Sequence, residues 1–114
     1  MPRDDASYLL DMLLAAHDAV HFAIGLTSEQ FEQSRLHRKA ILKAIEIIGE
    51  AAGRISTETK LAHPDIPWTA IIGLRNRLVH AYFEVNLERV WDTVQSDLPR
   101  LIELIEPLVP PEVE

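Results

Sequence analysis

Apolar residues recur every three or four positions in four segments of this chain, and this spacing constrains the fold more than any other feature. In the second segment, apolar side chains from Ile41 to Ile55 fall on one face while charged side chains occupy another. This pattern is typical of an amphipathic α-helix, whereas a half-buried strand alternates with a period of two. No segment has the alternating pattern. The sequence therefore predicts an all-α protein.

Start and stop signals give the bounds of the first two expected helices. The first runs from about residue 5 to Gly25, because glycine commonly ends a helix. The second begins at Thr27, an N-cap residue with Gln30 three positions later as its capping-box partner. We expect it to continue as one long helix to about residue 55.

The second half of the chain supplies two more helices. Polar and helix-breaking residues at 56–65 predict a loop, after which a third helix covers about residues 68–80. Asn86 can cap the last helix, and Pro99 inside it predicts a kink. We expect an antiparallel bundle of four main helices, formed by a single domain of residues 1–106, followed by a flexible proline-rich tail at 107–114.

Composition narrows the class of protein. The chain has 114 residues, 47% of them hydrophobic, which is enough for one domain with its own core. It has no cysteine, which removes disulfides and thiolate chemistry and fits a reducing cytoplasm. Charged residues interrupt the first apolar segment, so we expect a cytoplasmic protein with no membrane partner.

The formal net charge of −7 argues against broad electrostatic binding of nucleic acid, which usually requires a basic surface. The basic residues are nevertheless clustered. One group comprises Arg35, Arg38, Lys39 and Lys43, and a second comprises Arg75 and Arg77. Local positive patches can therefore exist on an acidic protein.

The stretch from Arg75 to Phe83 contains the strongest candidate for a functional site. A guanidinium is a permanent, fork-shaped phosphate binder, and the imidazole of His80 can move a proton near neutral pH. RNA carries its own nucleophile, the 2′-hydroxyl, so its cleavage requires a base, an acid and a cation beside the phosphate. These residues therefore suggest phosphodiester chemistry without a metal or another cofactor.

The spacing of these residues limits how they can act together. Asn76 and His80 are four residues apart and share one face of a helix, so Asn76 could orient the imidazole. Arg75 and His80 are five apart, roughly 140° around the helix, and would not converge from one straight helix. Either the helix ends near His80 and the chain turns, or a second copy supplies a matching helix. We favour the second copy, and a turn after His80 can accompany it.

Ordinary structural roles remain open for each residue. His80 could complement the dipole at a helix C-terminus, Arg75 and Arg77 could form surface ion pairs, and Tyr82 could be a packing aromatic. His17 and His21 share a helix face, but two histidines make a weak metal site, and we expect no metal. The residues alone do not decide between a site and these roles.

Three segments resemble the HEPN superfamily, and most closely the HepT-like toxins of prokaryotic toxin–antitoxin pairs. They are residues 48–52 (IGEAA), residues 66–68 (IPW) and the R-x-x-x-x-H-x-Y pattern formed by Arg75, His80 and Tyr82. The resemblance covers nearly the whole chain. The last pattern is the most specific, because it falls on the third helix of a short all-α chain.

The resemblance implies a homodimer that is a metal-independent endoribonuclease, with both motifs lining a shared cleft. Arg75 would stabilise the scissile phosphate, His80 would transfer protons, and Asn76 and Arg77 would support them. The resemblance also implies a type VII-like pair, in which an MntA-like nucleotidyltransferase antitoxin attaches AMP to Tyr82. The alternative is a non-catalytic helical dimer that serves as a partner or modification target of that nucleotidyltransferase, which the acidic net charge favours.

Overall fold

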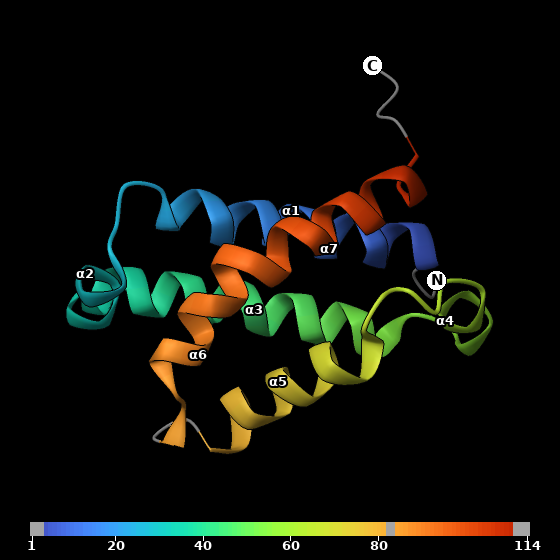
Figure 1. Ribbon diagram of the computed structural model, residues 1–114. Helices are drawn as coiled ribbons and strands as arrows, with labels where there is room; N and C mark the ends of the chain where they lie inside the picture. The colour runs from blue at the N-terminus through green and yellow to red at the C-terminus, as the bar shows by residue number, and fades with distance from the viewer. Residues whose placement is uncertain (1–3, 82–83, 111–114) are drawn as a thin grey trace.

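The computed structural model describes residues 4–81 and 84–110, and within these residues all regular secondary structure is helical (Figure 1). Helix α1 (Asp5–Ala23) and helix α3 (Arg35–Arg54) run antiparallel and pack along most of their lengths. Helix α7 (Leu98–Ile105) lies against α1, and helix α5 (Trp68–His80) lies against α3. The predicted all-α bundle is confirmed.

The helix expected from Thr27 to about residue 55 is wrong in one respect, because the chain forms two helices there. Thr27 and Gln30 make the predicted capping box, with the Thr27 N–H donating to Gln30 Oε1 at 2.9 Å. The helix it starts, α2 (Ser28–Gln33), ends after six residues. Ser34 then caps α3, since its Oγ accepts a hydrogen bond from the His37 N–H at 3.2 Å. This local hydrogen bond of Ser34 competes with the continuation of α2.

The expected loop at 56–65 contains a short helix, α4 (Thr57–Ala62), capped by Ser56. The carboxylate of Asp5, at the start of α1, accepts a hydrogen bond from the Ser56 N–H at 3.0 Å. It also accepts from the hydroxyls of Ser56 and Thr59. These bonds, led by that of the Ser56 side chain, lower the pKa of Asp5 below its ordinary value of 3.8. Asp5 thus ties α4 to α1.

The last expected helix is divided into three parts. Asn86 caps α6 (Leu87–Asp92) as predicted, accepting from the Arg89 N–H at 3.1 Å. A π-helical segment, η2 (Thr93–Asp97), separates α6 from α7. Pro99 lies in the first turn of α7 and has no N–H for the carbonyl one turn earlier, so the irregularity predicted at Pro99 takes the form of this wider turn.

Beyond α7, the 3₁₀ segment η3 (Glu106–Leu108) begins where the flexible tail was expected, and Leu108 and Val109 pack against the core. The core is formed mainly between α1, α3 and α7. The ring of buried Phe31 of α2 packs against that of Trp91 of α6 in a tilted arrangement, with the ring centroids 5.5 Å apart. None of the helices in the described residues combines the length and apolar character needed to cross a bilayer.

Candidate functional site

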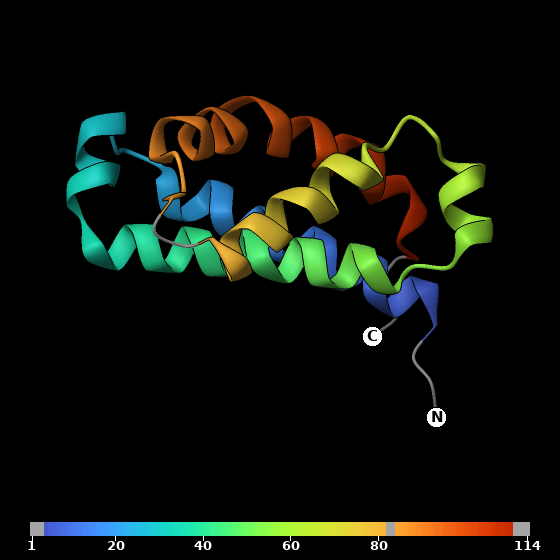
Figure 2. The same ribbon diagram turned by 90° about the horizontal axis from the view of Figure 1, so that it is seen from below.

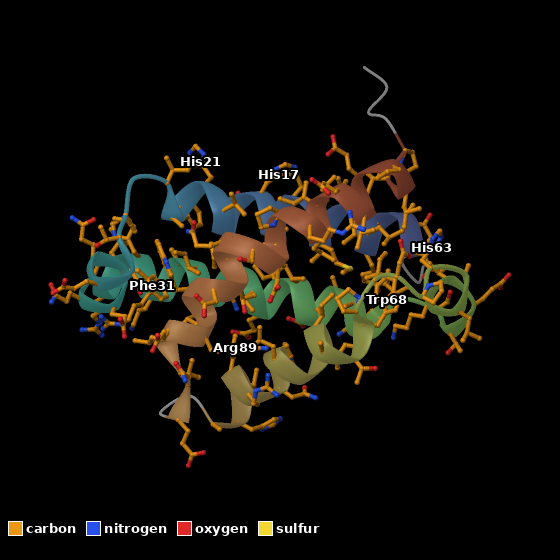
Figure 3. All side chains as sticks on the ribbon, in the orientation of Figure 1. His17, His21, Phe31, His63, Trp68 and Arg89 are labelled. Atoms are coloured by element: carbon orange, nitrogen blue, oxygen red, sulfur yellow. The ribbon has the colours of Figure 1, made fainter. Side chains whose placement is uncertain are left out.

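The segment before α5 fixes where that helix begins. Ile66 and Trp68 are both buried, and the indole N–H of Trp68 donates to the backbone oxygen of His63 at 3.0 Å. His63 and Trp68 lie together where the chain enters α5 (Figure 3). This hydrogen bond satisfies the only polar atom of a buried indole. The IPW segment therefore anchors the first turn of α5, and α5 spans the residues predicted for the third helix.

A glycine contact sets how closely α5 approaches α3. A Cβ placed on Gly49 would lie 2.1 Å from Cβ of Arg75 and 2.8 Å from its Cγ. Gly49 is buried, and the stem of Arg75 occupies the space that a side chain would fill. The two helices run antiparallel (Figure 2). The IGEAA segment thus carries the residue that allows Arg75 to pack on α3.

Arg75 is half-buried as a result. Its guanidinium NH1 donates to Asn76 Oδ1 at 3.3 Å, whereas its Nε is buried and has no hydrogen-bond partner among the described residues. Buried polar groups are normally paired, and an unpaired one costs about 1–3 kcal/mol. Arg75 therefore carries a donor unpaired within the described chain, where its stem packs against α3.

The end of α5 exposes the other predicted site residues. Asn76, Arg77 and His80 are all exposed, and His80 is the last residue of the helix. The guanidinium of Arg75 donates to Asn76, and Asn76 lies one turn before His80 on the same face of α5. The arginine head group thus approaches the helix face of His80, although the Cα–Cβ bonds of Arg75 and His80 point in different directions. The helix does end at His80, as one of the two geometric solutions required. Tyr82 lies outside the described residues.

The expected alternatives for the arginines can also be compared with the structure. Neither Arg75 nor Arg77 forms an ion pair with any described residue, so the surface-pair role is wrong within that part of the chain. His17 and His21 are exposed on α1, on the opposite edge of the molecule from α5 (Figure 3). In the described ranges no three His, Asp or Glu side chains form a group that could hold a metal ion.

A groove of about 700 Å³ lies beside the site, between α5 and the α6–α7 arm. Apolar side chains such as Ile48, Leu74 and Leu101 line it, and Arg77 contributes to its wall from α5. Arg89 contributes from α6, where it lies between α6 and α5 (Figure 3). Arg75, Asn76 and His80 do not line the groove. The local sequence pattern around Arg89 does not indicate which helix it faces, so its place in the groove could not be predicted.

The fold and this cluster define a class: an all-α bundle with an arginine, an asparagine and a histidine at the exposed end of one helix. The family described as "Ribonuclease HepT-like" matches residues 12–108. The chain belongs to this HepT-like family, a branch of the HEPN superfamily.

Curated relatives agree with this assignment. The chain is 37% identical over 101 residues to "Probable ribonuclease HepT" of Thermococcus cleftensis, which covers 89% of this chain and 92% of that protein. It is 34% identical over 104 residues to "Putative RNase MJ1380" of Methanocaldococcus jannaschii, covering 91% of this chain and 95% of the relative. No solved structure matches the chain.

Proposed function

We propose that this protein is a metal-independent endoribonuclease and the toxin of a toxin–antitoxin pair. The observation that carries the proposal is the contact between Arg75 and Asn76 one turn before the exposed His80, in a chain of the HepT-like family. The relatives named as ribonucleases, which match nearly the whole chain, support the same activity.

The chemistry follows from the residue types. The 2′-oxygen of the RNA attacks the neighbouring phosphorus, and the bond from phosphorus to the 5′-oxygen breaks. A proton leaves the 2′-hydroxyl and another reaches the departing 5′-oxygen, and imidazole can perform either transfer. Arg75 would stabilise the charge that develops on the phosphate oxygens. The products are a 2′,3′-cyclic phosphate and a 5′-hydroxyl.

A homodimer supports this reaction better than a single chain. One α5 offers one His80, whereas the reaction needs a base for one oxygen and an acid for the other. A second copy related by twofold symmetry would supply the second histidine. We therefore place two copies of the α5 end in one cleft. Sedimentation of the unmodified protein at micromolar concentration tests the dimer, and a monomer would contradict it.

We further propose that a nucleotidyltransferase antitoxin of the MntA type inactivates the protein by attaching AMP to Tyr82. Tyr82 follows His80 by two residues, so their Cα atoms are at most about 7 Å apart. The phosphate of the nucleotide would place negative charge beside Arg75 and repel the RNA backbone. Modification and cleavage would thus compete for one cationic site.

Cleavage of a structured RNA in EDTA tests the proposed activity. Wild type is compared with His80→Ala and Arg75→Ala, and His17→Ala serves as the control because His17 is an exposed histidine on α1. We expect cleavage by wild type and the control, and losses of about 10²–10⁴ in rate for His80→Ala with unchanged circular dichroism. Equal, negligible cleavage by all proteins would instead favour the non-catalytic helical dimer, which the net charge of −7 makes the second candidate.

A further inference from the structure

We propose that Lys39 and Lys43 of α3 bind RNA phosphates next to the one held by Arg75 and His80. This inference rests on the proposed ribonuclease function and names the surface that holds the flanking strand. It also addresses how a chain with a net charge of −7 could hold a polyanion.

The two lysines lie where α3 meets the end of α5. They line a hollow of about 360 Å³ together with Leu42, Glu46 and Leu78 of α5. Lys39 and Lys43 are one helical turn apart and project from the same flank of α3. Leu78 follows Arg75 by three residues and shares its face of α5, and the C-terminal end of α5 lies beside the N-terminal half of α3 (Figures 1 and 2). The hollow therefore lies beside the face of α5 that carries Arg75.

The antiparallel packing of α3 and α5 also brings together two segments without acidic residues. Residues 33–45 and 66–81 contain no Asp or Glu, yet they carry six of the chain's 11 Lys and Arg residues. The 18 acidic residues all lie elsewhere in the sequence. Helices α3 and α5 thus carry a local excess of positive charge near the hollow, where Glu46 is the acidic lining residue, and a local field of this kind attracts phosphate even when the net charge is negative.

Both lysines are available to a ligand. Lys39 is exposed and makes no ion pair with any described residue. The side chain of Lys43 is 64% exposed, and its Nζ lies 3.7 Å from Glu46 Oε1. Such an exposed pair contributes little and can be exchanged for a phosphate contact. The sequence pattern places Lys39 and Lys43 on a charged, solvated face of the second expected helix, whereas the structure shows that this face borders α5 at Leu78.

Binding of a fluorescent single-stranded RNA of mixed sequence tests the inference. The protein is prepared without AMP on Tyr82 and with His80→Ala to suppress cleavage. Its affinity for the RNA is measured over a range of KCl concentrations. Lys39→Gln and Lys43→Gln are made singly and together. Lys60→Gln, on α4 at the opposite end of α3, is the control with the same change of charge (Figure 1). Glu46→Gln removes the acid beside the lysines and tests the sign of the effect.

We expect each lysine variant to lower the slope of log affinity against log salt by about 0.7, the value for one phosphate contact on a single strand. The double variant should weaken binding about tenfold, Lys60→Gln should not, and Glu46→Gln should tighten binding. In the cleaving protein, KM should rise in the lysine variants while kcat changes little.

The outcomes separate this inference from the proposed function. If wild type cleaves RNA but the lysine variants bind like Lys60→Gln, the inference is overturned and the ribonuclease assignment stands. If wild type does not cleave RNA but the lysine substitutions weaken RNA binding, the proposed function fails and the assignment of Lys39 and Lys43 as phosphate-binding residues stands. Neither cleavage nor binding of RNA by wild type would overturn both.

Discussion

Substitution of Gly49 by alanine tests the link between helix packing and the site. The new Cβ would lie 2.1 Å from Cβ of Arg75, whereas carbon atoms in contact are about 3.5 Å apart or more. The obstacle is the base of a side chain and cannot be relieved by a rotamer change. Helix α5 must therefore move away from α3 by about 1.4 Å, the difference between the two distances.

The expected energy follows from two opposing effects. Overpacking of this kind costs about 1–3 kcal/mol, while replacing a helical glycine by alanine contributes up to about 1 kcal/mol of helix propensity. We expect Gly49→Ala to lower the free energy of unfolding by about 1–2 kcal/mol. Displacement of Arg75 by about an ångström should also reduce RNA cleavage by about 100-fold. Urea denaturation measures the first effect, and initial cleavage rates measure the second.

Gly53 provides a matched control on the same helix. A Cβ on Gly53 meets no heavy atom within 4 Å, so Gly53→Ala should gain helix propensity and stabilise the protein by up to about 1 kcal/mol. The two alanine variants should thus change stability in opposite directions. The reasoning is refuted if Gly49→Ala is as stable and as active as Gly53→Ala.

Three further predictions concern the helix ends and the modification. Asp5→Asn should destabilise the protein at pH 7. Because the hydrogen bonds of Ser56 lower the pKa of Asp5 in the folded state, the carboxylate stabilises the fold above about pH 3.8, and this stabilisation disappears as the pH falls through the folded-state pKa. The urea midpoints of wild type and Asp5→Asn should therefore converge on acidification. A gap that persists unchanged at pH 2 would count against this clamp. Ser34→Ala should cost about 1 kcal/mol in the same assay through loss of the α3 cap, and an unchanged midpoint would show that the cap is dispensable. Tyr82→Phe should keep its circular dichroism and escape AMP addition by the cognate nucleotidyltransferase, and a mass increase of the mutant by one AMP would disprove the position.

Local sequence signals predicted the elements whose causes are local. The capping box at Thr27 and the extent of α5 follow from neighbouring residues, and both are confirmed. Ser34 was missed as a helix start because the residue three positions later is His37, not the Glu or Gln of a capping box. The predicted helix ran through a break that one serine hydroxyl stabilises.

In the candidate site, too, only the features that depend on neighbouring residues could be predicted from the sequence. Arg75, Asn76 and His80 could be selected from their types and spacing within one helix, although that spacing could not tell how the arginine would reach Asn76. The role of Gly49 depends on a residue 26 positions away in the sequence, and no local pattern reveals such a contact. The positions of Arg89 in the groove and of Lys39 and Lys43 in the hollow likewise depend on the packing of separate helices.

The most direct test of the central claim is the chemical identity of the RNA ends produced by the unmodified protein in EDTA, using one substrate with a ribonucleotide and one with a 2′-deoxynucleotide at the cleavage position. The mechanism predicts 2′,3′-cyclic phosphate and 5′-hydroxyl ends from the first substrate, no cleavage of the second, and loss of the products in His80→Ala. Cleavage of the deoxy substrate, or 5′-phosphate and 3′-hydroxyl ends, would contradict it, since neither can arise from attack by the 2′-hydroxyl.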